Sequence, residues 1–247
     1  VTLTATKKNI KKKSSTTKTT TKTMSDYYCN QKFWWLTVNL ENLHTHSCCS
    51  ATPQKIDLTW LKQNPGKLFN TPDLIEDRRL MLNNQPALSC AASCWNPESV
   101  GNQSRRLMEN GCARTHTDLE SEVEVINITT GRDCNLTCVY CGKFYSSAWA
   151  RDIITKTYPV AVNDDSFTVN AVDRILNKVS QKEISISPTK QLLINEIQKL
   201  YQSPKLREVR ISGGEPFLYL ELSKLVEEID NSSVEVIIHT GLGVDEN

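Results

Sequence analysis

The sequence predicts an α/β protein with a parallel sheet, because apolar strands and amphipathic helices alternate along its second half. The expected strands cover residues 122–130, 208–211 and 233–240. Apolar side chains recur at helical spacing in the segments 173–179, 191–201 and 218–229. Alternation of this kind favours parallel strands joined by right-handed crossovers, with the helices packed against the sheet.

Residues 24–112 are expected to form a smaller α+β module rich in cysteine, since six of the nine cysteines fall there. An aromatic strand is predicted at 33–38, followed by a turn at 44–47. Helices are predicted at 57–63 and 72–82, and Ser104 is expected to cap another. A chain of 247 residues is long enough for this module and a second domain at 120–247.

Residues 1–23 differ in composition from the rest of the chain. They hold seven Lys, nine Thr and no acidic residue. We expect this tail to be disordered or artefactual, with Met24 as a plausible start; a genuine basic tail that touches nucleic acid or an anionic surface is the alternative. Without these lysines the formal charge changes from +1 to −6, so nucleic acid is an improbable partner of the body. No apolar run approaches the ~20 residues that span a bilayer.

The most informative motif is the C-x3-C-x2-C run of Cys134, Cys138 and Cys141, directly after the first predicted strand. Three thiolates can hold three irons of a 4Fe–4S cluster and leave the fourth iron open to a ligand. A zinc site usually shows four ligands in two pairs. Disulfides need an oxidising compartment, and no secretory signal is visible. An iron–sulfur site is therefore favoured, with another metal site as the alternative.

Two further motifs follow the second and third predicted strands. Gly213, Gly214 and Glu215 precede Pro216, and Thr240 follows His239. Glycines without Cβ atoms allow a small zwitterion close to the backbone, and a carboxylate can accept hydrogen bonds from its ammonium group. An ordinary strand-to-helix turn is the alternative. All three motifs stand at carboxyl ends of strands, where parallel α/β barrels build their sites.

Together these motifs resemble the radical S-adenosylmethionine (radical SAM) superfamily. The resemblance implies that residues 120–247 are the first half of a partial (β/α)6 TIM-like barrel, truncated at its C-terminus. It also implies SAM bound to the open iron, reductive cleavage to a 5′-deoxyadenosyl radical and hydrogen abstraction from a substrate. The residues implied to contact SAM are Tyr140, Gly213, Gly214, Glu215 and Thr240. The family often has Thr-Asn-Gly at the third strand end, where this chain lacks the Asn.

The cysteines of the first module resemble the twitch or SPASM module that accompanies many radical SAM enzymes. The resemblance implies a second, auxiliary 4Fe–4S cluster on Cys29, one of Cys48 and Cys49, Cys90 and Cys94. Two features depart from the usual pattern: the last pair is C-x3-C, and the module precedes the core. A structural zinc site, with His44 or His46 in place of one thiolate, is the competing interpretation.

These resemblances imply a cytoplasmic radical SAM enzyme. A peptide or protein is the leading substrate class, and a flavodoxin or ferredoxin would donate electrons. Three alternatives remain open. They are a non-catalytic iron–sulfur scaffold or electron carrier, a zinc-stabilised binding module, and an activase that installs a glycyl radical on a partner. Cys112 has no expected role beyond that of a buried free thiol.

Overall fold

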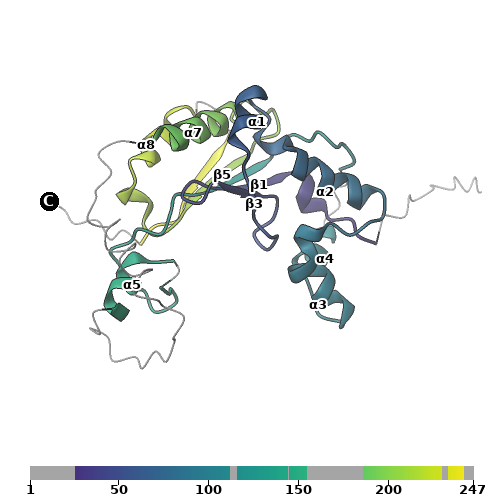
Figure 1. Ribbon diagram of the computed structural model, residues 1–247, viewed down its shortest axis with the longest axis horizontal. Helices are drawn as coiled ribbons and strands as arrows, with labels where there is room; N and C mark the ends of the chain where they lie inside the picture. Colours follow the sequence, from purple (N-terminus) through teal and green to yellow (C-terminus); the bar gives the residue numbers. More distant parts are fainter. Residues whose placement is uncertain (1–25, 112–115, 144, 155–185, 230–232, 242–247) are drawn as a thin grey trace, which may run out of the picture.

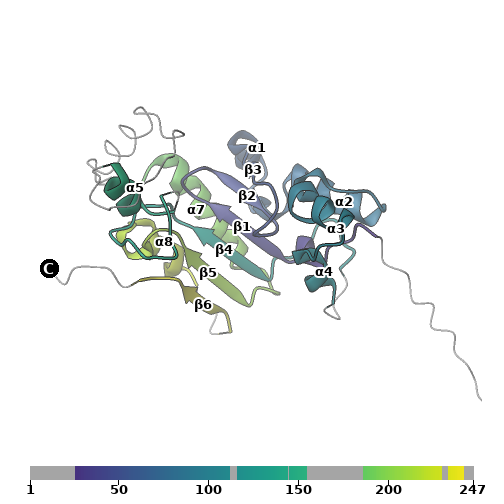
Figure 2. The same cartoon turned by 90° about the horizontal axis from the view of Figure 1, so that it is seen from below.

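The computed structural model describes residues 26–111, 116–143, 145–154, 186–229 and 233–241. It confirms the predicted α/β class. The described strands form one six-stranded mixed sheet in the order β3-β2-β1-β4-β5-β6 (Figure 2). Their bounds are β1 Trp35–Asn39, β2 His44–His46, β3 Gln54–Lys55, β4 Val125–Thr129, β5 Glu208–Ser212 and β6 Glu235–Ile238.

Strands β1, β4, β5 and β6 are parallel, whereas β2 and β3 extend the sheet in antiparallel fashion. The four strands expected from the sequence are confirmed, with bounds that differ from the predicted ones by a few residues. The predicted turn at 44–47 is wrong, because this segment forms strand β2. The chain turns earlier, where the side chain of Asn39 accepts hydrogen bonds from the amides of Glu41 and Asn42 and Leu43 takes a positive φ of 55°.

Strand β1, from the N-terminal part of the chain, pairs in parallel with β4. Trp35 lies opposite Val125 in this parallel pair, and Asn39 lies opposite Thr129. Leu36 and Val38 of β1 are fully buried in the same core as the apolar residues of β4. The N-terminal segment and the core segment therefore share one sheet and one hydrophobic core.

Helices begin where the sequence provides capping groups. The side chains of Asp57, Ser104 and Ser187 accept backbone hydrogen bonds at the starts of α1, α4 and α7. The helices are α1 Leu58–Gln63, α2 Pro72–Leu82, α3 Asn96–Ser99, α4 Arg105–Asn110, α5 Ser147–Ile154, α7 Pro188–Leu200 and α8 Glu221–Glu227. The helix expected at 218–229 begins later, after the 3-10 turn Pro216–Leu218. The helix expected at 173–179 lies outside the described residues.

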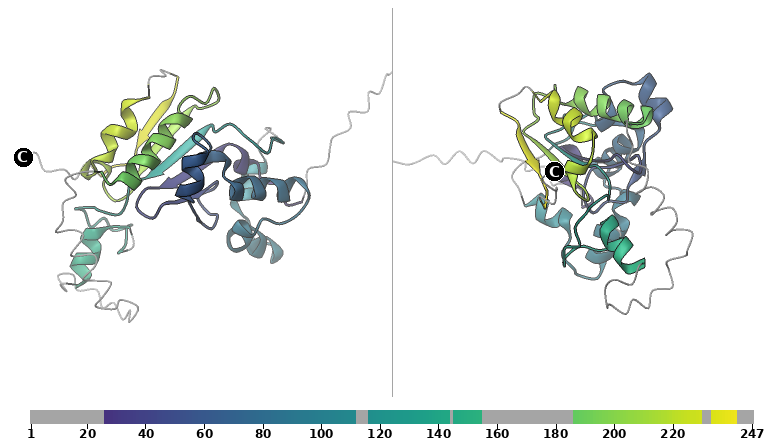
Figure 3. Two further views of the ribbon diagram at one scale, coloured as in Figure 1. Left: turned by 45° about the horizontal axis from the view of Figure 1, so that its top comes forward. Right: turned by 90° about the vertical axis from the view of Figure 1, so that its left-hand side faces the viewer.

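Helices α1, α7 and α8 cover one face of the sheet, whereas no helix among the described residues crosses the parallel strands on the opposite face (Figures 1, 2 and 3). The core lies between sheet and helices and includes Ile126 and Ile128 of β4 and Leu193 and Ile197 of α7. Because side chains alternate along a strand, the neighbouring positions point to the open face. They include Thr37, Asn127 and Arg210, which share one register row. None of the described helices has the length and apolar character to cross a membrane.

Candidate functional site

The cysteine loop leaves the carboxyl end of β4 and is held in place by the first turns of α5. The amide of Cys134 donates to the hydroxyl of Ser147 over 2.9 Å, and that hydroxyl donates back to the Cys134 carbonyl over 3.0 Å. The indole of Trp149 donates to the Cys138 carbonyl over 2.8 Å. A backbone hydrogen bond of 2.9 Å from Cys141 to Cys138 closes the turn between the last two cysteines. The loop is thus anchored at each of its cysteines.

The two glycines of the second motif lie directly beneath the backbone that enters this loop. The amide of Gly214 donates to the carbonyl of Gly131 over 2.8 Å. A Cβ atom on Gly214 would lie 2.2 Å from the carbonyl oxygen of Asp133, and one on Gly213 would lie 2.5 Å from the hydroxyl of Thr130. Gly213 also has a φ of 151°. Both positions therefore need glycine so that the loop can cross the end of β5.

Glu215 connects the second motif to the third. Its carboxylate is fully buried and accepts hydrogen bonds from the Thr240 hydroxyl at 2.7 Å, the Gly241 amide at 2.9 Å and the Phe217 amide at 3.3 Å. A Cβ atom on Gly241 would lie 2.4 Å from the side chain of Leu136, within the cysteine loop. The three sequence motifs therefore meet at one edge of the sheet. The predicted contacts of Glu215 and Thr240 with SAM stay predictions.

The three thiols of the loop are partly exposed, and Tyr140 contacts one of them. Tyr140 is 88% exposed, and its pKa is raised by a hydrogen bond with the Cys138 thiol and by the charges of Cys138, Cys141 and Cys134. The sulfur of Cys134 accepts a hydrogen bond from the Leu136 amide at 3.4 Å. Across the described part of the chain, no three Cys, His, Asp or Glu side chains are already arranged to hold a metal ion.

A second group of cysteines is buried in the N-terminal part of the chain. Cys29, Cys90 and Cys94 pack in one apolar cluster with Met81, Ala87 and Trp95. Cys48 is also buried, whereas Cys49 is exposed. Cys29 acts electrostatically on both Cys48 and Cys90. The structure thus brings together three of the cysteines predicted for the second cluster, Cys29, Cys90 and Cys94, and burial distinguishes Cys48 from its neighbour.

The pKa values of these thiols are strongly shifted. Burial raises the pKa of Cys29 to about 11. The thiol of Cys48 donates to the sulfur of Cys49, which raises the pKa of Cys48 and lowers that of Cys49 to about 5. The thiol of Cys90 donates to Cys94 in the same way, so the pKa of Cys90 rises and that of Cys94 falls to about 6.

Backbone amides also point at the sulfurs of this cluster. The nearby amides of Gln31 and Lys32 oppose the rise in the pKa of Cys29, and the amide of Arg106 helps to lower the pKa of Cys94. Cys48 accepts from the Ser50 amide over 3.4 Å. Hydrogen bonds to sulfur stabilise the thiolate form and are one means by which proteins tune iron–sulfur clusters.

Polar groups without a protein partner border the same cysteines. Both amide atoms of Gln31, a residue with 0% exposure, lack a hydrogen-bond partner among the described residues, as does the hydroxyl of Ser47, with 1% exposure. Gln31 follows Cys29 by two positions, and Ser47 directly precedes Cys48. Buried polar groups are costly when they have no partner and call for an explanation such as an additional bound group. Ordered water or a bound group would supply the missing partners of these atoms.

A buried lysine completes this region, and sequence reasoning missed it. The ammonium group of Lys32 donates to Asp77 over 2.6 Å and to Ser89 over 2.8 Å, and the Ser89 hydroxyl donates to Asp77 over 2.6 Å. Burial opposes the charge of Lys32, but Cys90 and Asp77 outweigh it and raise the pKa of Lys32 above its usual value. The only sequence signal was a lysine three positions after Cys29, directly before the predicted aromatic strand.

The two cysteine groups lie at opposite ends of the parallel strands. The loop with Cys134 follows the carboxyl end of β4, whereas Cys29 precedes the parallel strand β1. Cys48 follows β2, which runs antiparallel to β1 and so ends at the amino edge of the parallel strands. Figure 1 shows the same separation, with α5 at one end of the molecule and α3 and α4 at the other.

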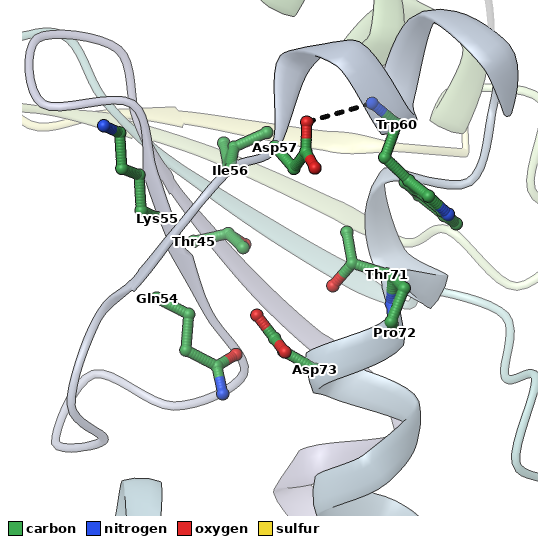
Figure 4. A pocket seen from close by; sticks show the side chains of 9 residues that line it. All are labelled: Thr45, Gln54, Lys55, Ile56, Asp57, Trp60, Thr71, Pro72 and Asp73. Atoms are coloured by element: carbon green, nitrogen blue, oxygen red, sulfur yellow. Dashed lines mark hydrogen bonds between the residues drawn. The ribbon is translucent and has the colours of Figure 1, made fainter.

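A pocket of about 200 Å³ lies apart from both groups, between β3 and the starts of α1 and α2 (Figure 4). Asp57 and Asp73 stand at its wall, and Asp57 already caps α1 through the amide of Trp60. None of the predicted site residues lines it. In comparisons with known proteins, no family model, curated protein or solved structure matched the chain.

Proposed function

We propose that this chain is part of a radical SAM enzyme, which cleaves S-adenosylmethionine reductively and abstracts hydrogen from a substrate. One observation carries the proposal. The cysteine loop lies on Gly213 and Gly214, and Glu215 joins that motif to Thr240, all at the carboxyl edge of parallel strands. Sites of parallel α/β barrels are built at this edge.

Cys134, Cys138 and Cys141 would hold three irons of a 4Fe–4S cluster, whose open iron would take the amino and carboxylate groups of SAM. When bound, the cluster supplies the electron for cleavage of SAM. The protein positions the loop through Ser147 and Trp149. The exposed ring of Tyr140 offers an aromatic surface to the adenine of SAM.

We further propose that the sheet is the first part of a partial (β/α)6 barrel. The arrangement of α7 and α8 on one face supports this, because barrels place their helices outside and their side-chain-filled interior on the other face. The polar row of Thr37, Asn127 and Arg210 would then face the interior. It would offer hydrogen bonds to a polar substrate such as a peptide.

The buried cysteines would hold the auxiliary 4Fe–4S cluster of a twitch or SPASM-like module. Burial favours Cys48 over the exposed Cys49 as the ligand beside Cys29, Cys90 and Cys94. The amide donors to sulfur and the unpaired groups of Gln31 and Ser47 support a bound group at this place. A cytoplasmic electron donor such as flavodoxin or ferredoxin and a peptide or protein substrate complete the proposal.

Anaerobic reconstitution of the full-length protein with iron and sulfide tests this function. About eight irons per chain and release of 5′-deoxyadenosine, after dithionite and SAM are added, are the expected results. The Cys134→Ala variant should keep about four irons and release no 5′-deoxyadenosine. The control Cys112→Ala changes a cysteine that neither site uses and should match the wild type.

Three results would contradict parts of the proposal. Iron without 5′-deoxyadenosine in the wild type would favour an iron–sulfur scaffold. If the wild type binds about four irons, which Cys29→Ala keeps and Cys134→Ala loses, only the proposed auxiliary cluster is contradicted. Zinc as the sole bound metal would overturn the radical SAM assignment.

A further inference from the structure

We propose that Lys32 is the internal counter-cation of the buried cysteine cluster and sets the electrostatic balance of the metal centre bound there. This inference rests on the proposed auxiliary site. Lys32 lies in the 3-10 helix Asn30–Phe33, which begins directly after Cys29, and its side chain is 1% exposed. An ammonium group in this position is out of reach of the counter-ions that screen surface charges.

The hydrogen bonds of Lys32 hold its charge beside the cysteines. The ammonium group contacts Asp77 of α2 at 2.6 Å and Ser89 at 2.8 Å, and Ser89 directly precedes Cys90. The Ser89 hydroxyl lies 3.7 Å from the Cys90 sulfur. The charge of Lys32 acts on both Cys29 and Cys90. Ser89 thus links the ammonium group of Lys32 to the sulfur of Cys90.

The chemistry of the cluster explains why a cation is useful here. Cysteine thiolates carry negative charge, and the net charge and hydrogen bonding of an iron–sulfur centre are main determinants of its reduction potential. A buried positive charge stabilises the more negative, reduced state. Removal of Lys32 should therefore make reduction harder, and neutralisation of Asp77 should make it easier.

A purely structural ion pair makes a different prediction. Lys32 and Asp77 share the same hydrogen bonds, so a structural role requires that either substitution disturbs the cluster in a similar way. A charge effect requires shifts of opposite sign. Ser89→Ala removes hydrogen bonds to both residues without a change of charge and is the matched control.

The experiment uses the full-length chain with Cys134, Cys138 and Cys141 all changed to Ala, so that only the second site can hold iron. After reconstitution with iron and sulfide, a redox titration followed by absorption and electron paramagnetic resonance gives the midpoint potential. Lys32→Met is expected to lower the ratio of reduced to oxidised cluster at the wild-type midpoint at least tenfold, about 59 mV for a one-electron couple. Asp77→Asn is expected to raise this ratio.

Shifts of the same sign in both variants, or shifts no larger than that of Ser89→Ala, would overturn the inference. If circular dichroism shows that Lys32→Met does not fold, Asp77→Asn decides alone, and a lowered or unchanged potential counts against the proposal. Absence of iron in the triple-alanine background, when the wild type binds iron, would remove the second site and this inference with it. If the wild type forms no 5′-deoxyadenosine, that result contradicts the proposed function and leaves the role of Lys32 unaffected.

Discussion

The carboxylate of Glu215 accepts a hydrogen bond from the hydroxyl of Thr240 over 2.7 Å, and this bond joins the carboxyl ends of β5 and β6. The second carboxylate oxygen accepts from the Gly241 amide over 2.9 Å. Because Glu215 is fully buried, these donors supply the hydrogen bonds that water cannot provide. The glutamate of this motif therefore has a structural task at the site, whichever ligand binds there.

Replacement of Glu215 by Gln should destabilise the fold by about 1–3 kcal/mol, because the new amide group cannot accept both hydrogen bonds. Urea denaturation at neutral pH measures the change. Glu227→Gln is the matched control, since that carboxylate is 58% exposed and pairs with Lys224 on the surface of α8. The control should change the free energy of unfolding by less than about 0.5 kcal/mol. Equal losses in both variants would contradict the structural role of Glu215.

Gly214→Ala should displace the cysteine loop, because the added Cβ atom would lie 2.2 Å from the Asp133 carbonyl oxygen. We expect a loss of about 2–4 kcal/mol in the free energy of unfolding and faster thiol labelling of Cys134 in the folded protein. Gly142→Ala is the control, since a Cβ atom there meets nothing within 4 Å. A Gly214→Ala protein with wild-type stability and labelling rate would refute the close approach of the two segments.

Arg78→Met should cost about 3–5 kcal/mol, because the fully buried guanidinium group holds several acceptors together. It donates hydrogen bonds of 2.7–2.9 Å to the carbonyls of Lys32, Phe69 and Leu119 and to the side chain of Asn70. Arg79→Met, at the next position, removes a half-exposed partner of Glu76 and should cost much less, because surface ion pairs contribute little to stability. Chemical denaturation of the two variants side by side measures the difference. Similar midpoints would show that the hydrogen bonds of Arg78 do not stabilise the fold.

Local sequence signals were sufficient for most of the elements and for the meeting of the three motifs. The helix Pro72–Leu82 was predicted to the residue, because a proline at the first position marks its start. Cys134, Gly214 and Thr240 could be placed at one edge, because the carboxyl ends of neighbouring parallel strands coincide. These conclusions needed only short-range patterns and the handedness of βαβ units.

Long-range pairing was beyond these signals. Nothing local in Trp35–Asn39 indicates that it pairs with β4, because its apolar pattern suits any buried strand. The turn before β2 was misplaced, since Asn39 supports a turn through its own side chain while His44–His46 carries no strong strand signal. The ion pair of Lys32 and Asp77 joins residues 45 positions apart, and a buried charge of this kind is visible only once the fold is known.

The free energy of unfolding at alkaline pH should depend on Tyr201. Its hydroxyl donates to the Leu225 carbonyl over 2.6 Å, and burial raises the pKa of this phenol above the usual value of about 10. Because the folded-state pKa is the higher one, the stabilisation is complete below about pH 10 and is lost as the pH rises from there towards the folded-state pKa. Tyr201→Phe should be about 1 kcal/mol less stable than the wild type at pH 8, and this gap should narrow as the pH rises above about 10. Denaturation curves across this range measure the gap, and Tyr145→Phe, at a position that is 71% exposed, should run parallel to the wild type. A gap that stays constant for Tyr201→Phe would show that this phenol ionises equally in the folded and unfolded chains.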